Sequence, residues 1–150
     1  MILALDIASV TGVAYGPKGG TPRGWIEDFG KGSHPSRFFW AQQFLARFLR
    51  DHPSPDVILY EAPWMNKRRD NLKKLALLNG LITAMQIAAH SAGVPMRGVS
   101  VQAINRAFLG CQPPAGMRKA AIMTRCRQIG WDVTAQDAAD AMALWATEGL

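Results

Sequence analysis

Residues 1–16 constrain the fold of this chain more than any other stretch of its sequence. They begin with an apolar run, reach a single carboxylate at Asp6, turn through Ala8 and Ser9, and become apolar again up to Tyr15. This pattern predicts a short buried strand, a tight turn and a second strand that pairs back on the first. Burying an isolated carboxylate is unfavourable unless it is paired, hydrogen-bonded or bound to a metal, so Asp6 requires a partner. Within this stretch alone, the simplest partner is a backbone N–H group of the turn, which Asp side chains often cap.

The length and composition predict one globular domain. A chain of 150 residues has the size of an ordinary domain and can bury a substantial core, so we assign residues 1–150 to a single domain. Hydrophobic residues make up 49% of the sequence, which excludes intrinsic disorder as the default state.

Several features predict a cytoplasmic protein. The longest apolar runs fall well short of the roughly 20 residues that cross a bilayer, and no signal peptide opens the chain. The two cysteines, Cys111 and Cys126, form no C-x-x-C motif, and the three histidines are scattered. This pattern argues against a zinc site and fits a reducing compartment.

The charge balance favours a polyanionic partner. Lys and Arg number 17 against 11 Asp and Glu, which gives a net charge of +6. Because no basic amphipathic segment that could anchor to a membrane surface is visible, nucleic acid is the favoured polyanion.

Hydrophobic periodicity, capping residues and Gly or Pro breaks predict the remaining elements. The expected strands lie at residues 24–30, 56–60 and 96–101. The expected helices lie at residues 33–52, 71–92, 102–109 and 117–129, and from residue 134 almost to the C-terminus. Three antiparallel strands followed by strands that alternate with helices predict an α/β protein with a five-stranded mixed sheet flanked by helices.

Four carboxylates are placed to form one site. Asp6 and Glu61 each end a predicted buried strand, and such strand ends tend to meet at one edge of an α/β sheet. Asp137 and Asp140 are three residues apart, which puts both on one face of a helix rich in small apolar residues. Four converging acids would repel one another unless cations lie between them, and oxygen ligands suit Mg²⁺ or Mn²⁺. Two such ions about 4 Å apart could activate water against a phosphodiester.

Asp137 and Glu61 also have simpler interpretations. Asp137 is the last residue of a Thr134-Ala-Gln-Asp sequence, which fits a capping box at a helix start. Glu61 could be a strand-end charge that pairs with Arg68 or Arg69. Asp140 lies one turn further into the helix among alanines, where neither explanation applies as readily.

Three segments together resemble the active-site motifs of RuvC-type Holliday junction resolvases, a family of the RNase H-like, retroviral-integrase superfamily. They are Asp6-Ile-Ala-Ser-Val-Thr-Gly12, the strand ending Leu-Tyr-Glu61, and the pair Asp137-Ala-Ala-Asp140. The resemblance covers nearly the whole chain in order and spacing, and the predicted element order is that of the RNase H-like fold. Ala8 departs from the pattern because many members have Gly there, which implies a slightly tighter hairpin.

The resemblance implies a metal-dependent endonuclease. Its metal ligands would be Asp6, Glu61, Asp137 and Asp140, with two Mg²⁺ ions per site that Mn²⁺ could replace. The enzyme would be a homodimer that nicks opposed strands of a four-way DNA junction and leaves 5′-phosphate and 3′-hydroxyl ends. The helix at residues 71–92 resembles the family's dimerisation helix. Its apolar stripe, which includes Leu75 and Met85, could form that interface or could equally be core.

The resemblance also implies contacts with DNA. Trp64 lies where the family has an aromatic residue that stacks near the junction crossover, although it could instead be a buried anchor of its loop. Basic residues would hold phosphates without reading sequence. For Lys67, Arg68, Arg69, Lys73 and Lys74, the alternative is a purely structural role as solvated residues at the start of a helix. This alternative is the weaker one, because cations at a helix N-terminus oppose the helix dipole. The residues assigned to DNA binding are Trp64, Lys67, Arg68, Arg69, Lys73, Lys74, Arg106 and Arg118.

Lys119 is assigned a catalytic role by the same resemblance. It opens the penultimate predicted helix, in the position of a family lysine near the scissile phosphate. A second family lysine has no equivalent here, because the chain offers Asn105-Arg106 at that place.

Other functions remain open at this point. The chain could be another RNase H-like nuclease that acts on branched DNA or precursor RNA, or a DNA-binding scaffold without catalysis. The Asp6 hairpin also resembles the phosphate-binding turn of actin-like ATPases and sugar kinases. Those proteins need two such domains and a second glycine-rich loop, both of which this chain lacks.

Overall fold

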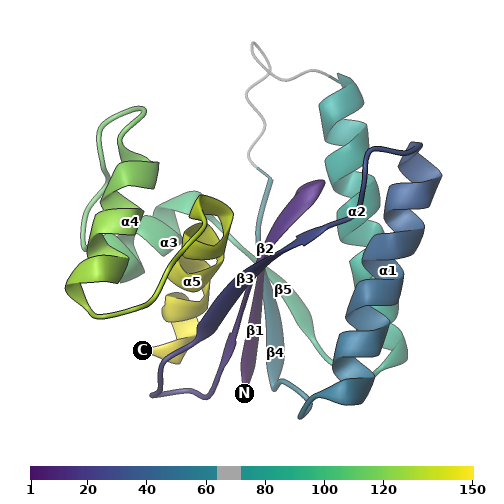
Figure 1. The fold of residues 1–150 in the computed structure, drawn as a ribbon, viewed down its shortest axis with the longest axis horizontal. Helices are drawn as coiled ribbons and strands as arrows, with labels where there is room; N and C mark the ends of the chain where they lie inside the picture. The colour runs from purple at the N-terminus through teal and green to yellow at the C-terminus, as the bar shows by residue number, and fades with distance from the viewer. Residues whose placement is uncertain (64–71) are drawn as a thin grey trace.

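The centre of the protein is a mixed β-sheet that carries helices on both faces (Figure 1). The structure, a computed structural model, describes residues 1–63 and 72–150. Within these residues the sheet has five strands in the order β3-β2-β1-β4-β5. The strands are β1 (Ile2–Asp6), β2 (Val10–Gly16), β3 (Arg23–Asp28), β4 (Val57–Glu61) and β5 (Met96–Val99). β1, β2 and β3 pair antiparallel, whereas β4 runs parallel to both β1 and β5, as the sequence predicts.

The turn between β1 and β2 is closed by a buried threonine. The Ala8 N–H donates to the Thr11 hydroxyl oxygen at 3.2 Å, and that hydroxyl donates to the Ala8 carbonyl at 2.7 Å. Thr11 is fully buried. In the described part of the chain, no hydrogen bond reaches the Asp6 carboxylate, so the interpretation of Asp6 as a turn cap is wrong. Thr11 satisfies the turn and leaves the Asp6 carboxylate available for another partner.

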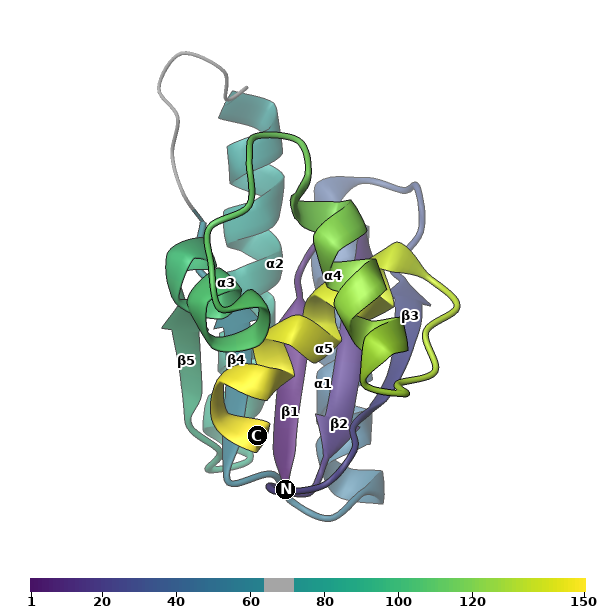
Figure 2. The same cartoon turned by 90° about the vertical axis from the view of Figure 1, so that its left-hand side faces the viewer.

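Two helices cover one face of the sheet and three lie on the other (Figures 1 and 2). The first pair is α1 (His34–Asp51) and α2 (Leu72–Ser91). The second group is α3 (Val101–Leu109), α4 (Arg118–Gln128) and α5 (Gln136–Gly149), of which α5 lies directly on the strands. The predicted N-cap of α1 is confirmed, because the Ser33 side chain accepts a hydrogen bond from the Ser36 N–H.

The apolar stripe of α2 is core. Ile82, Met85 and Ala89 are buried in the cluster that α1, α2 and the sheet share, and Leu78 packs against it. Of the two roles left open by the sequence for this stripe, packing inside the domain is therefore the one observed. Among the described residues, no helix combines the length and the apolar character needed to cross a membrane.

Three predicted element ends differ from the structure by two residues, and one of them is the end of the strand predicted at residues 24–30, because β3 ends at Asp28. The strand predicted at residues 96–101 ends at Val99, because the Ser100 side chain accepts from the Ala103 N–H and starts α3 at Val101. The last helix begins at Gln136 rather than at residue 134, with Ala135 as its N-cap. Hydrophobic periodicity places the middle of an element better than its ends.

Candidate metal centre

Strand pairing places the first two acids side by side. β1 and β4 run parallel, and their register pairs Leu5 with Tyr60. Asp6 and Glu61 are the next residues on the two strands, so their carboxylates leave the same edge of the sheet. The expectation that two strand ends bring two acids together is met by this geometry.

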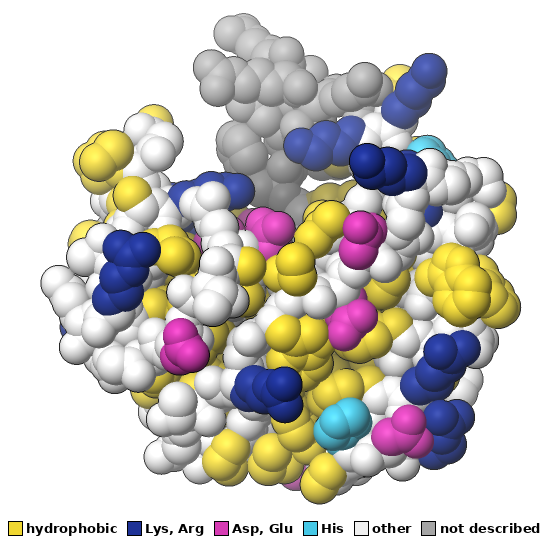
Figure 3. All heavy atoms as spheres, in the orientation of Figure 1, with side chains coloured by type: hydrophobic (Ala, Val, Ile, Leu, Met, Phe, Trp, Pro, Cys, Tyr) yellow, Lys and Arg dark blue, Asp and Glu magenta, His cyan; other side chains and the backbone are white. Residues whose placement is uncertain are grey.

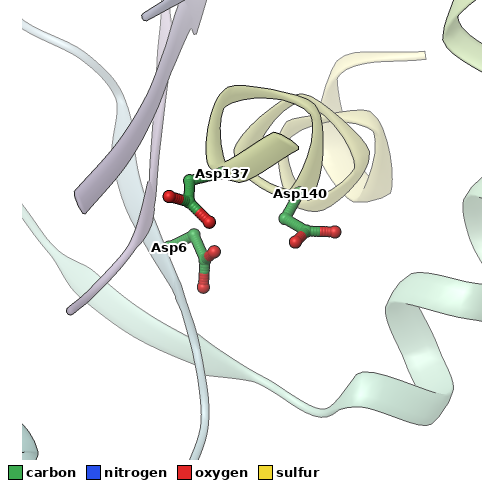
Figure 4. Close-up of side chains that lie close together, drawn as sticks. All are labelled: Asp6, Asp137 and Asp140. Carbon is green, nitrogen blue, oxygen red and sulfur yellow. The ribbon is translucent and has the colours of Figure 1, made fainter. Parts of the chain in front are cut away.

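Helix α5 brings the other two acids to the same edge. Half of its buried residues are alanines, whose small side chains let it approach β1 and β2 closely. Asp137 and Asp140 occupy its first turns, and their carboxylates converge with that of Asp6 (Figure 4). One ligand oxygen from each of these three residues lies within 4.8 Å of the others. The three acids thus come from segments more than a hundred residues apart in the sequence and meet at one point.

The cluster disfavours its own negative charge. The pKa of the Asp6 carboxyl is raised from 3.8 to about 7. Burial is the largest cause, the charges of Asp140, Glu61 and Asp137 also contribute, and the guanidinium of Arg118 opposes the shift. A cation among the carboxylates would remove this repulsion and favour the ionised form.

Asp140 provides a buried oxygen without a hydrogen-bond partner. Its Oδ1 is inaccessible to solvent and makes no hydrogen bond in the described part of the chain. The closest cation is the Arg118 Nη1 at 3.9 Å, too far for a hydrogen bond. Burial raises the pKa of the Asp140 carboxyl to about 6, which Arg118 and Lys119 counteract. Oxygen-only donors, one of them buried and unsatisfied, fit a hard divalent cation.

Arg118 connects Glu61 to a polar network. Its Nη2 donates to Glu61 Oε2 at 2.8 Å, and its Nε donates to Asn105 Oδ1 at 3.0 Å. The Asn105 amide then donates to Gln112 Oε1 at 2.9 Å, and Gln112 donates to the Gln102 carbonyl. Asn105 is almost completely buried. This network could not be predicted from the sequence, since its members lie in three separate segments with no shared motif.

The structure decides two of the alternative interpretations. The capping box at the start of α5 is absent, because Ala135 is the N-cap and no side chain bonds there. Asp137 therefore lies in the first helical turn, where its charge is favoured by the helix dipole, with its carboxylate in the cluster. The partner of Glu61 in the described chain is Arg118. Arg68 and Arg69, the partners considered from the sequence, lie outside the described residues.

The other predicted site residues are more dispersed. Lys119 is exposed beside Arg118 at the start of α4, close enough to lower the pKa of Asp140. Lys73 and Lys74 are exposed at the start of α2, and Arg106 is exposed on α3. Outside the described residues lie Trp64, Lys67, Arg68 and Arg69. On the face that Figure 3 shows, Lys and Arg side chains are scattered among acidic and apolar ones.

A groove on the described surface is separate from the acids. This groove of about 680 Å³ lies between β3 and α1 and is lined by aromatic residues such as Trp25, Phe44 and Phe48. None of the four acids lines it. The chemistry therefore has to be sought at the carboxylates, which meet at the open edge of the sheet.

Comparison with known proteins identifies the fold. No protein-family model matches the chain, and no curated protein does. The structure of RuvC from Thermus thermophilus superposes with a TM-score of 0.73 at 18% identity, covering 97% of this chain and 91% of that chain. RuvC from the same organism in complex with a Holliday junction substrate gives a TM-score of 0.73 at 16% identity, covering 97% and 90%. The yeast mitochondrial Holliday junction resolvase gives 0.61 at 14%, covering 97% and 76%. The chain has the fold of these proteins, and the predicted RNase H-like fold is confirmed.

The repulsion within the cluster predicts that replacing Asp6 by Asn stabilises the metal-free protein. With a pKa near 3.8 when unfolded and about 7 when folded, Asp6 is protonated in both states only well below pH 3.8, and it destabilises the fold increasingly as pH rises from there towards 7. In EDTA at about pH 8, we expect Asp6→Asn to raise the free energy of unfolding by on the order of 2 kcal/mol, with a much smaller gain at about pH 4.

Urea denaturation of both proteins at the two pH values measures this difference. Asp132→Asn, which changes an exposed acid, is the matched control and should have little effect. An Asp6→Asn protein that is no more stable than the unsubstituted chain at the higher pH would contradict the repulsion.

Proposed function

We propose that this protein is a metal-dependent endonuclease that resolves four-way DNA junctions by paired symmetric nicks. The observation that carries the proposal is the cluster of Asp6, Asp137 and Asp140, with a buried oxygen that lacks a hydrogen-bond partner. Glu61 adds a fourth carboxylate at the adjacent strand end. The fold adds support, because one of the similar structures is a RuvC in complex with a Holliday junction substrate.

The four acids would hold the metal ions. Asp6, Glu61, Asp137 and Asp140 supply oxygen ligands only, which suits Mg²⁺, with Mn²⁺ as a substitute. Two bound ions would supply an activated water and neutralise the leaving oxygen of the phosphodiester. The carboxylates themselves would bind and orient the ions, and their placement on β1, β4 and α5, with Asp140 buried, keeps them in one geometry.

Two cations next to the acids have different tasks in this proposal. Arg118 is held by Asn105 and Glu61, so it fixes the Glu61 carboxylate and limits the negative charge of the cluster. Lys119 is exposed on the adjacent position, where its ammonium can bind a phosphate of the substrate. We retain the predicted catalytic role of Lys119 and assign Arg118 to positioning in addition to its predicted DNA contact.

The remaining DNA contacts stay predictions. Lys73, Lys74 and Arg106 are exposed and can reach phosphates, whose binding gives affinity without sequence preference. Stacking by Trp64 and phosphate binding by the basic cluster after it rest on the sequence alone. A cytoplasmic location is likewise the prediction from the sequence.

We also propose a homodimer through α2. Because the apolar stripe of this helix is core, an interface must use the opposite face. That face carries Ile87, which is 51% exposed, next to Thr83 and Gln86. We place the contact between the two copies at this isoleucine, because the other side of the helix is buried inside the domain.

Cleavage of a labelled mobile four-way junction tests the proposed function. We expect paired symmetric nicks in Mg²⁺ that disappear in EDTA, which removes the cations, and in Asp6→Asn, which removes one of their ligands. Linear duplex and a splayed flap are the control substrates. Equal cutting of the flap would replace the resolvase by a broader branch-specific nuclease, and junction binding without cutting in Mg²⁺ or Mn²⁺ would indicate a scaffold. Absence of binding would contradict the nucleic-acid assignment.

Sedimentation velocity tests the dimer. We expect Ile87→Glu to convert a dimer into a monomer, because a charge in an apolar interface remains unpaired. Ile26→Glu is the matched control, since Ile26 is 46% exposed on β3 and should not affect assembly. An unsubstituted chain that sediments as a monomer, or a dimer that survives Ile87→Glu, would contradict the proposed interface.

A further inference from the structure

Gly12 lies at the point where α5 meets the sheet. On β2 it is the register partner of Asp6 in β1. On the side of α5, a β-carbon added to Gly12 would lie 1.8 Å from the carbonyl oxygen of Asp137 and 2.5 Å from its carbonyl carbon. Gly12 thus pairs with Asp6 across the sheet and lies directly against the backbone of Asp137.

Position 12 requires glycine for a steric reason and not for its backbone conformation. The glycines with positive φ are at other positions, so the backbone of Gly12 is not in the left-handed region. An alanine could adopt its conformation but would collide with main-chain atoms, which cannot rotate away as a side chain can. Any substitution must move the start of α5 away from β2.

Such a movement would act on two ligands at once. Asp137 and Asp140 both belong to the first turns of α5, whereas Asp6 belongs to β1. A shift of α5 of roughly 1 Å would therefore change the spacing between the two helix acids and Asp6. Functional constellations tolerate displacements of only about 0.5 Å.

We infer that Gly12 is a positioning residue that sets the spacing of the metal centre by allowing the Asp137 backbone to rest on β2. The inference rests on the proposed metal-binding function of the acids. It concerns binding of the ions themselves, which precedes any contact with DNA.

A second glycine provides a matched control. Gly24 on β3 also faces α5, but a β-carbon added there would meet the Met142 sulfur at 2.6 Å and come no closer than 3.5 Å to the Ala138 carbonyl. A methionine side chain can adjust its rotamers, so Gly24→Ala should leave the helix start in place. The two substitutions add the same methyl group under the same helix and differ in what it meets.

The experiment compares Gly12→Ala and Gly24→Ala by calorimetric titration with Mn²⁺ and by crystal structure. We expect Gly12→Ala to bind Mn²⁺ roughly 10- to 100-fold more weakly than the unsubstituted chain. Losses of this size are common when a residue that supports a metal ligand is replaced. Its structure should show the start of α5 displaced from β2. Gly24→Ala should match the unsubstituted chain in both measurements.

The other possible outcomes test the role of Gly12 and the proposed function separately. Unchanged Mn²⁺ affinity in folded Gly12→Ala, or an undisplaced helix, overturns the inference. If the unsubstituted chain binds no Mn²⁺ while Gly12→Ala shows the displacement, the positioning stands and the proposed function fails. A variant that remains unfolded even with a stabilising osmolyte would assign Gly12 to folding and overturn its role in the site.

Discussion

The close contact between α5 and the strands β1 and β2 brings the acids together and builds the core on that face of the sheet. Alanines and Gly12 remove the side-chain volume that would normally separate a helix from a sheet. The helix can then bury most of its length, including Asp140, in the core that it shares with α3 and α4. Apolar burial on this scale is the main stabilising term of a domain. It can hold the carboxylates of Asp6 and Asp140 in a partly or fully buried position, which is unfavourable for a charged group.

That packing creates an electrostatic conflict that bound cations would resolve. Asp6 and Asp140 are pushed towards their protonated forms by burial and by each other, and Arg118 offsets the repulsion only partly. Arg118 is itself held by Glu61 and Asn105, so its charge is fixed at the margin of the cluster instead of at its centre. A functional site often shows such a conflict, because selection for chemistry retains an arrangement that stability alone would remove.

The sequence predicts most of the fold because its elements are locally consistent. The apolar runs that end at Asp6 and Glu61, the Ser33 cap and the alanine-rich final helix each predict their element correctly, and their order predicts the mixed sheet. The four acids could be proposed from strand ends and from the spacing of Asp137 and Asp140. The contacts of Arg118, Asn105 and Thr11 could not, because they depend on how segments distant in the sequence meet. From the sequence, Gly12 could be recognised only as part of a motif. Glycine is needed there because the backbone of α5 comes very close to β2, and no sequence pattern encodes that contact.

The position of a bound metal tests most sharply whether α5 and the sheet build a cation site. Crystals of the protein grown or soaked with Mn²⁺ would be measured at a wavelength where manganese scatters anomalously. We expect a peak between the carboxylates of Asp6, Asp137 and Asp140, with Glu61 at the same site and the protein fold unchanged. Manganese bound elsewhere on the chain, or an empty acid cluster in Mn²⁺-saturated crystals, would contradict the claim that α5 and the sheet together build a cation site.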